Sequence, residues 1–475
     1  MDHSYGVVYE PEKLEKYVFT LDKAVRAGID IRYVRIYWVD LANTRRCRLL
    51  PINYFKELLR SKRPGVNVGK VGLGLVYLIT PPCFSPIGEY IYALDMSTLR
   101  PLPFAPGTIA VLGFFEEKTP YMDPQGALTV NVPTCPRTVL KRVVENAEET
   151  CKTRFLVGFE TEFILLSNTR PVTASSVHQW SATSGMLAGS KEAQFLEDIG
   201  NAMHDAGLSL QMLHPESAPG QYEVVSGPLS PLDAADQVIF VREFVANLAA
   251  KHDLHATFAP RPFMNSAGSA AHIHISVHRR DGSKKPADKL SDNESSFLAG
   301  VLEHLPAIPA ITLPIPASYK RMTDGVWSGG TYVHYGTENR EAPIRLTNLT
   351  SPESRKFEMR FVDATSNPHL ALAAIIGAGL TGLRESKELT MTDVKGPKCA
   401  WEMDEAERQA LGITKRMPLD IEQARANLEQ DEVMKDVLGS ELIEKYLSVN
   451  RTLGDALSKQ GETEEQELSR LVEFF

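Results

Sequence analysis

The sequence predicts an α+β protein with a small N-terminal domain followed by a large domain. Strand-like and helix-like runs follow one another irregularly along the 475 residues. The regular strand–helix alternation of a doubly wound parallel sheet is missing. The composition, with 43% hydrophobic and 23% charged residues, is that of a globular chain. Such a chain is long enough to bury a large core without disulfide or metal support.

The charge balance and the cysteines exclude several classes of protein. The chain has 51 Lys+Arg against 60 Asp+Glu, a net charge of −9, so we expect no nucleic-acid partner. Five scattered cysteines without a Cys-x-x-Cys pair favour a reducing compartment over a disulfide framework or a thiolate zinc site. The N-terminus lacks the apolar core of a signal peptide, and the apolar stretch 370–383 is too short to cross a bilayer. We therefore expect a cytoplasmic protein without a membrane partner.

The N-terminal part is expected to be β-rich. Residues 1–20 form a polar, partly amphipathic extension, and residues 21–115 form the small domain. Between Ile31 and Leu50 two β-rich runs flank the turn-like residues 40–43, which predicts a hairpin. Short strands punctuated by Pro and Gly continue to about residue 115, where we place the boundary.

The large domain, residues 116–475, mixes helices and strands. A helix is predicted over 136–150, because Pro136 suits a first turn and apolar residues then recur at helical spacing. Residues 233–252 form an amphipathic helix, and the charge-rich residues 402–475 are mostly helical in period.

Four strand-like segments of the large domain each place charged or polar side chains on one face, since residues two apart in a strand share a face. Their sequences are VGFETEFILL, HPESAPGQYEVV, AHIHISV and RKFEMRFVD. The side chains concerned are Glu160, Glu162, Glu216, Glu223, His272, His274, Ser276, Lys356, Glu358 and Arg360. Taken singly, each pattern is also typical of a solvated strand face.

Taken together, the four faces favour a metal site. Several carboxylates at one point repel each other unless divalent cations lie between them. Carboxylates with few imidazoles suit Mg²⁺ or Mn²⁺. Nearby cations, including Arg340 and Arg345 in NREAPIRL, would bind phosphates and substrate carboxylates. The residues thus indicate a divalent-metal phosphoryl-transfer site. The chain has no P-loop, dinucleotide fingerprint or nucleophile elbow to suggest another chemistry.

Six segments in chain order resemble the glutamine synthetase family: GFETEF, HPESAPGQYE, GSAAHIHIS, KRMTDG, NREAPIR and KFEMRFVDATSNPHLALAA. The resemblance covers about residues 25–455. It implies a β-grasp-like N-terminal domain and a catalytic domain whose curved antiparallel sheet forms a funnel, with ATP entering one end and glutamate the other. It also implies a homo-oligomeric ring, a decamer or dodecamer, with each site shared between subunits.

The resemblance implies two metal sites, each holding Mg²⁺ or Mn²⁺. The first set of ligands is Glu162, Glu216 and Glu223. The second set is Glu160, His272 and Glu358. The residues that match the nucleotide side are His274, Ser276 and Lys356.

The remaining matched positions concern the substrates. Arg340 and Arg345 match the arginines that neutralise the transferred phosphoryl group. The positions that match those around glutamate are Arg321, Arg360 and the backbone of Gly268. Asp40 matches an aspartate that reaches into the neighbouring subunit's site and helps to deprotonate the amine.

The flap, KRMTDGVWSGG from Lys320 to Gly330, departs from the family pattern. Asp324 replaces a proline, and Trp327 or Ser328 stands where the flap glutamate belongs. Losing that negative charge disfavours ammonium, and an aromatic side chain there suits a larger or apolar amine. A Trp327 that simply packs its own loop is the alternative.

We therefore predict an ATP-dependent ligase that activates the γ-carboxylate of glutamate as γ-glutamyl phosphate and joins it to an amine other than ammonia. A genuine glutamine synthetase with a rearranged flap is one alternative. A catalytically silent relative acting as a scaffold or regulator is another, and the retained carboxylate cluster counts against it.

Overall fold

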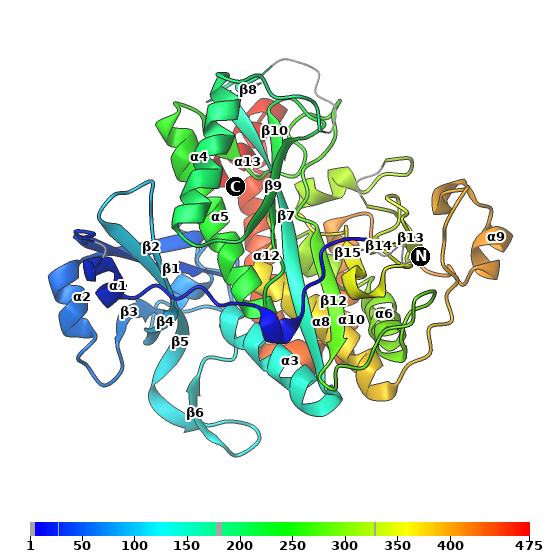
Figure 1. The fold of residues 1–475 in the computed structure, drawn as a ribbon, viewed down its shortest axis with the longest axis horizontal. Helices are drawn as coiled ribbons and strands as arrows, with labels where there is room; N and C mark the ends of the chain where they lie inside the picture. Colours follow the sequence, from blue (N-terminus) through cyan, green and yellow to red (C-terminus); the bar gives the residue numbers. More distant parts are fainter. Residues whose placement is uncertain (1–4, 27, 177–182, 327–328) are drawn as a thin grey trace.

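Two β-sheets organise the molecule (Figure 1). The computed structural model describes residues 5–26, 28–176, 183–326 and 329–475. A six-stranded sheet in the N-terminal part runs in the order β2-β1-β5-β4-β3, with β6 paired to β5. A nine-stranded sheet follows in the order β13-β14-β15-β12-β7-β10-β9, with β8 and β11 paired to β7. Helices and strands alternate irregularly along the chain, so the α+β prediction is confirmed.

The small sheet contains the predicted hairpin. Its strands are β1 (Tyr33–Val39), β2 (Arg45–Pro51), β3 (Gly65–Gly69), β4 (Glu89–Pro101), β5 (Thr108–Met122) and β6 (Leu128–Asn131), with helices α1 (Leu21–Arg26) and α2 (Ile52–Leu58) beside them. β1 pairs antiparallel with β2 and parallel with β5. The expected domain boundary at residue 115 falls inside β5, because this strand continues to Met122 and turns into β6. The small sheet therefore extends to Asn131.

The large sheet carries the four strands with charged faces. Its members are β7 (Thr153–Thr169), β8 (Val172–Ala174), β9 (Leu210–Pro215), β10 (Gln221–Ser226), β11 (His255–Thr257), β12 (Ile273–Arg279), β13 (Tyr335–Thr337), β14 (Ile344–Thr347) and β15 (Lys356–Met359). All pairings are antiparallel except that of β13 with β14. In β7 the residues alternating with the glutamates, such as Phe159 and Phe163, are buried in the core.

Helices cover the sheet and fill the second half of the chain. The α-helices are α3 (Pro136–Cys151), α4 (Lys191–Asp205), α5 (Pro231–Lys251), α6 (Asp292–His304), α7 (Pro309–Thr312), α8 (Pro368–Glu385), α9 (Glu405–Ala410), α10 (Ile421–Gln430), α11 (Glu432–Leu438), α12 (Ser440–Leu457) and α13 (Glu464–Phe474). The short 3₁₀ helices are η1 (Pro11–Lys13), η2 (Lys70–Leu73), η3 (Pro316–Arg321), η4 (Pro352–Ser354) and η5 (Ala400–Glu402). The helices predicted near 136–150, 233–252 and 402–475 are thus confirmed.

The apolar stretch 370–383 is the body of α8, whose residues are buried within the protein. Helices α3, α5 and α6 pack around it. Within the described residues, none of the helices has the length and apolar character that a bilayer crossing requires.

A buried polar network joins the two sheets through the helices between them. The Arg137 guanidinium on α3 donates two hydrogen bonds of 2.8 Å to the Asp236 carboxylate on α5. It also donates to the Gly113 carbonyl on β5, at 2.9 Å, and to Asp95 on β4, at 2.9 Å. His369 on α8 lies 2.8 Å from Asp236 through Nε2. The N-terminal sheet is therefore fixed to the helices that support the large sheet.

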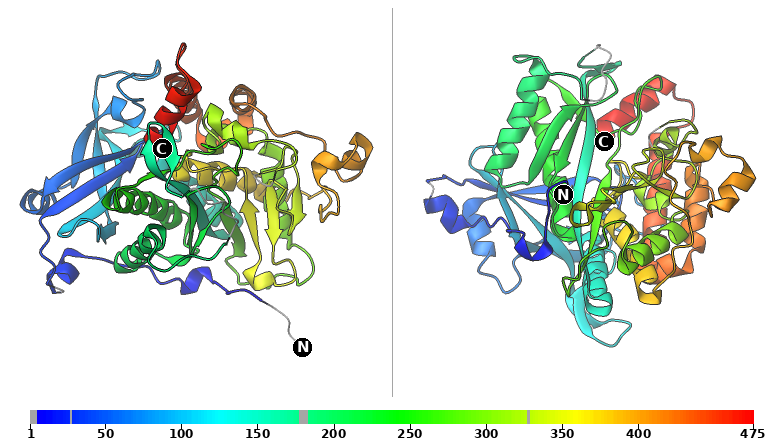
Figure 2. Two further views of the ribbon diagram at one scale, coloured as in Figure 1. Left: turned by 90° about the horizontal axis from the view of Figure 1, so that it is seen from above. Right: turned by 45° about the vertical axis from the view of Figure 1, so that its right-hand side comes forward.

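The N-terminal extension crosses the outside of the large domain. The dark-blue segment in Figure 2 runs from the small sheet along the large domain toward the N-terminus. Its far end is held by the loop before β15, because the Tyr5 amide donates to Ser351 Oγ at 3.0 Å. We refer to residues 5–20 as the strap.

Candidate active site

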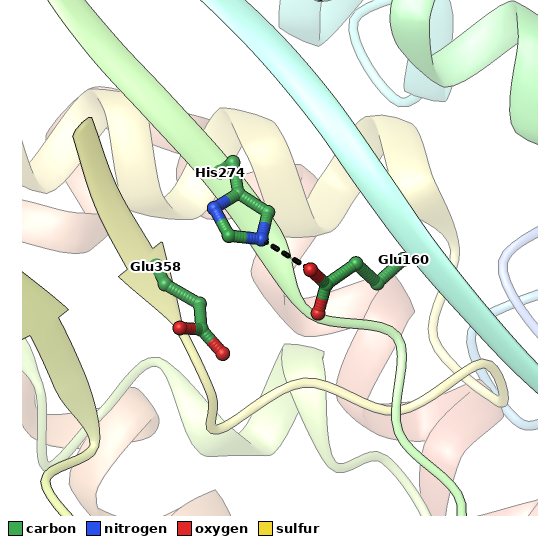
Figure 3. A group of neighbouring side chains, drawn as sticks. All are labelled: Glu160, His274 and Glu358. Carbon is green, nitrogen blue, oxygen red and sulfur yellow. Dashed lines mark hydrogen bonds and ion pairs between the residues drawn. The ribbon is translucent and has the colours of Figure 1, made fainter. Parts of the chain in front are cut away.

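One group of charged side chains follows the strand register across four strands. Arg345 on β14 pairs with Glu358 on β15, and Glu358 pairs with His274 on β12. His274 in turn pairs with Gly158 on β7, which has no side chain. Glu160, two residues along the same strand, leans over this position toward His274 (Figure 3). The register thus gathers side chains that are far apart in the sequence, from Glu160 to Glu358, on one face of the sheet.

A second group lies on the other side of β7. Glu162 on β7 pairs with Glu223 on β10, and Glu223 pairs with His214 on β9. Glu216 follows directly after β9, at the start of the turn into β10. The two groups are adjacent because Glu160 and Glu162 point from the same face of one strand.

The first group has the geometry of a cation site. The Glu160 carboxylate lies 2.7 Å from His274 Nε2 through Oε1 and 3.1 Å from His272 Nδ1 through Oε2. His272 Nδ1 is also 3.7 Å from Glu358 Oε1. Glu160, His274 and Glu358 each offer a ligand atom, and these atoms all lie within 4.8 Å of one another. The sequence comparison assigned His272 to this metal, and the structure brings both histidines to the same carboxylates.

The second group includes a histidine that the sequence analysis missed. His214, Glu216 and Glu223 offer ligand atoms within 4.8 Å of one another. His214 Nε2 lies 3.1 Å from Glu223 Oε1, and its Nδ1 lies 3.6 Å from Glu216 Oε1. The segment HPE held the signal, because residues 214 and 216 are two apart at the end of a strand.

Glu162, which was expected to share a metal with Glu216 and Glu223, is buried. Its Oε2 accepts hydrogen bonds from the Ala270 amide at 3.0 Å and from Gln221 Nε2 at 2.8 Å. One of its oxygens is therefore committed to the protein, whereas Glu216 and Glu223 converge with His214. Gln221 Nε2 also donates to the carbonyl of Gly268 at 3.1 Å, which brings that backbone next to Glu162.

The electrostatics show that the carboxylates crowd one another. Burial, together with the neighbouring charges of Glu223 and Glu216, raises the pKa of Glu162 well above its ordinary value. Burial also raises the pKa of Glu223 to about 7, although the hydrogen bond from His214 works against this. The same hydrogen bond raises the pKa of His214 to about 9. Clustered acids that resist ionisation are typical of a site that a divalent cation completes.

The donor set fits Mg²⁺ or Mn²⁺. Each group combines two carboxylates with one imidazole in the convergent geometry, and no thiolate is present in either. Buried ring nitrogens of His272 (Nε2) and His274 (Nδ1) have no hydrogen-bond partner among the described residues. Oxygen-rich sets with single imidazoles suit these hard or borderline cations.

Arginines surround the carboxylates on the other sides. Arg345 Nη1 lies 3.0 Å from Glu358 Oε2, and Arg360 contacts the other oxygen of Glu358. Glu358 is buried, which would raise its pKa, but the Arg360 charge prevails and the pKa falls to about 2. Glu358 therefore remains ionised between two guanidinium groups.

Arg321 and Gly268 meet at the Glu162 end of the site. Arg321 is buried, and its charge favours the ionised form of Glu162. A Cβ atom at Gly268 would lie 2.7 Å from Arg321 Cγ and 2.8 Å from the Pro260 carbonyl. Only glycine fits between the backbone and this arginine.

The three residues expected on the nucleotide side also lie on this face. Ser276 is two residues beyond His274 on β12, and its Oγ lies 2.7 Å from His278 Nε2. Lys356 is half-buried at the start of β15, two residues before Glu358. His278 was not anticipated, and burial lowers its pKa to about 3, so it stays neutral.

Two expected site residues, Arg340 and Asp40, are not brought into the cluster. Arg340 is exposed in the loop before β14, without an ion-pair partner among the described residues. Asp40 lies in the β1–β2 turn, where its buried carboxylate accepts hydrogen bonds from the amides of residues 42 and 44 and from Arg46 at 2.7 Å. A reach into a neighbouring site would require Asp40 to leave these partners. Trp327 lies outside the described residues.

Comparison with known proteins identifies the family. Residues 133–470 match the glutamine synthetase catalytic domain. The chain belongs to the glutamine synthetase family. This match contains both carboxylate groups together with Arg321, Arg340, Arg345 and Arg360.

Relatives within the glutamine synthetase family are similar over most of this chain. Protein fluG of Emericella nidulans is 34% identical over 450 residues, which cover 93% of this chain and 49% of fluG. This chain thus spans about half the length of fluG. The gamma-glutamylpolyamine synthetase GlnA3 of Streptomyces coelicolor is 33% identical over 69% of this chain and 71% of its own length. A crystal structure described as a novel glutamine synthase homolog has a TM-score of 0.75 at 28% identity, covering 94% of this chain and 99% of that one.

Proposed function

We propose that this member of the glutamine synthetase family is an ATP-dependent ligase that joins the γ-carboxylate of glutamate to an amine other than ammonia. The observation that carries the proposal is the pair of adjacent carboxylate–imidazole groups bounded by Arg345, Arg360 and Arg321. The polyphosphate of ATP and the carboxylates of an amino acid are both anionic. Their binding requires a surface on which metal cations and guanidinium groups alternate with acidic side chains that are held in place.

Two divalent ions, Mg²⁺ or Mn²⁺, complete this site in the proposal. Glu160, His272, His274 and Glu358 would hold one, and Glu162, His214, Glu216 and Glu223 the other. When bound, such ions supply the positive charge that polarises a phosphoryl oxygen. The role proposed for His274 widens the expectation from the sequence, which placed it on the nucleotide side alone.

In the first step, an oxygen of the glutamate γ-carboxylate attacks the γ-phosphorus of ATP. The bond from that phosphorus to the β–γ bridging oxygen breaks, giving γ-glutamyl phosphate and ADP. Arg345, which is fixed by Glu358, and the exposed Arg340 are the guanidinium groups proposed to stabilise the transferred charge. Ser276 and Lys356 line the nucleotide side.

In the second step, the amine nitrogen attacks the activated carbonyl carbon and expels phosphate, and the amine loses a proton. Arg321 and Arg360 are proposed to hold the carboxylates of glutamate, with the Gly268 backbone beside them. Asp40 is proposed to assist the proton transfer across a subunit boundary. This part of the proposal also includes a homo-oligomeric ring.

The flap supports an acceptor larger than ammonia. The Asp324 carboxylate accepts a hydrogen bond from Thr331 and lies 2.8 Å from Arg416 Nη2. Trp401 lies against the flap, since a Cβ atom at Gly325 would be 3.6 Å from its ring. Of the two positions where the family pattern has a proline and a glutamate, the first carries Asp324, and the second, at 327–328, lies outside the described residues. GlnA3, whose name specifies a polyamine acceptor, is a relative of this chain.

The test is phosphate release with ATP, Mg²⁺ and glutamate across a panel of amines, with the products identified by mass spectrometry. The panel contains ammonium, ethylamine, ethanolamine, 1,4-diaminobutane and benzylamine. We expect turnover with at least one carbon-bearing amine and little with ammonium. Turnover with ammonium alone would indicate a genuine glutamine synthetase. Failure to bind ATP, together with no turnover, would indicate a silent scaffold or regulator.

A further inference from the structure

We propose that a cavity beneath the strap is a binding site for a small amphipathic monoanion, with an apolar body and one carboxylate recognised by Arg100. The cavity has a volume of about 540 Å³ and lies between the strap and the body of the protein. It is separate from the carboxylate groups, because none of their residues lines it. Its size is in the range of small-molecule sites.

The cavity walls come from distant parts of the chain. The strap contributes Tyr17, and the body contributes Phe155 and Leu156 at the start of β7. Val144 on α3 and Leu229 before α5 extend the apolar lining. The walls thus suit a hydrocarbon or aromatic body rather than a highly charged molecule.

Most charges around the cavity are already paired. Glu148 lies 2.6 Å from Arg154, and Asp233 lies 2.8 Å from Lys16 on the strap. The remaining acid, Glu15, is exposed on the strap. The cavity therefore offers little unpaired negative charge for a cationic ligand.

Arg100 is the exception among the lining cations. It forms no ion pair with a described carboxylate, and its hydrogen bonds to the carbonyls of residues 206 and 207 are both 3.4 Å long. Its guanidinium lies 4.8 Å from the centre of the Tyr17 ring. Burial lowers the pKa of Arg100, although the electrostatic influence of Tyr17, Asp233 and Asp236 works against this. A ligand carboxylate could accept two N–H bonds from this fork.

The strap closes the cavity through polar contacts. Glu12 lies 3.0 Å from Arg154, and Gln211 Nε2 donates to the Tyr9 hydroxyl at 2.7 Å. Such exposed pairs contribute about 0–1 kcal/mol each, so the strap can open to admit a ligand. Tyr17 is seated where a Cβ atom at Gly207 would lie 2.1 Å from its ring. Gly207, with φ +62°, has no side chain that would collide with the Tyr17 ring.

The strap also connects the cavity to the loop that leads into β15. Ser354 Oγ donates to the Tyr5 carbonyl at 2.6 Å. Gly6, with φ +90°, lies so close to Ser354 that a Cβ atom would be 2.7 Å from its Oγ. Glu358 follows four residues after Ser354. Occupation of the cavity is therefore expected to reduce motion both in the strap and in residues 348–355.

The test is calorimetric titration of the full chain with 4-phenylbutyrate and with its neutral isostere 4-phenylbutyramide. Titrations are repeated with saturating Mg²⁺, glutamate and a non-hydrolysable ATP analogue. We expect the carboxylate to bind about tenfold more tightly than the amide, with no displacement by the active-site ligands. Hydrogen exchange of residues 9–17 and 348–355 should slow on binding.

Two variants and one control variant test whether the two compounds bind in this cavity. Arg100→Gln should remove the tenfold preference, and Leu229→Trp should weaken both compounds by filling the cavity. Arg279→Gln, which alters an exposed arginine paired with Asp281, should bind as the unchanged protein does. Equal affinity for the two compounds, unchanged binding in both variants, no binding at millimolar concentration, or displacement by the active-site ligands would each overturn the proposal. All four results leave the ligase proposal untouched, because amine turnover tests that independently.

Discussion

The histidine that only the structure revealed offers the sharpest test of the proposed metal site. His214 Nε2 lies 3.1 Å from Glu223, and Nδ1 lies 3.6 Å from Glu216. Replacing it by glutamine removes one ligand or supporting hydrogen bond while Glu216 and Glu223 remain. Loss of such a group typically weakens metal binding about 10- to 100-fold, or about 1.4–2.8 kcal/mol. A charge-assisted hydrogen bond of this length contributes a similar amount.

The assay is the Mg²⁺ and Mn²⁺ dependence of phosphate release with ATP, glutamate and the best amine. We expect the half-saturating metal concentration of His214→Gln to rise about 10- to 100-fold, with kcat largely restored at saturating metal. The matched control is His252→Gln, since His252 also contacts a carboxylate at 2.8 Å, on Asp198, but lies outside both groups. An unchanged metal dependence in His214→Gln, or a kcat that saturating metal does not restore, would refute the reasoning.

Three further predictions concern the candidate active site and the buried polar network that joins the two sheets. Glu358→Gln leaves Arg345 and Arg360 without their shared carboxylate, so kcat should fall about 10²–10³-fold in the phosphate assay; retention of full activity would contradict the assignment. In Gly268→Ala the added Cβ would collide with both Arg321 and the Pro260 carbonyl, so Arg321 must shift. The KM for glutamate should therefore rise by up to about 100-fold while the KM for ATP stays the same; an equal change in both would point to misfolding. The pKa of Asp236 is held at about 2, below its ordinary 3.8, because the Arg137 and His369 contacts outweigh its burial. Its stabilising contribution, about 2 kcal/mol, is therefore present above pH 4 and lost as the pH falls toward 2, and chemical denaturation of Asp236→Asn should show less loss over that interval.

Much of the site was predictable because the strand period of two is a local property of the sequence. Glu160 with Glu162, and His272 with His274, were placed on common faces from spacing alone, and the structure keeps them there. The hairpin around residues 40–43 and the helix from Pro136 were predictable for the same reason, since each depends on adjacent residues. Register between strands could not be predicted in this way. That Glu358 faces His274, and Glu223 faces His214, depends on pairings across more than eighty residues in the first case and a turn in the second.

At the flap and at Asp40, the family pattern identifies the residues but does not predict which side chains and amides they contact. The pattern identifies which family residue is missing at the flap, but the partners of Asp324 come from Thr331 and Arg416, and the second lies far along the chain. At Asp40 the family pattern is kept, but the pattern does not reveal the contacts of the side chain. The Asp40 carboxylate accepts hydrogen bonds from residues 42, 44 and 46 of its own hairpin. Burial raises the pKa of Asp40 to about 6 despite the Arg46 contact, so this carboxyl retains a large desolvation cost. Because this pKa lies near neutral pH, the Asp40 carboxyl can exchange a proton more readily than an ordinary aspartate. The proposed role of Asp40 in proton transfer would thus draw on a property of the single chain, and the proposed ring would have to add access to the amine.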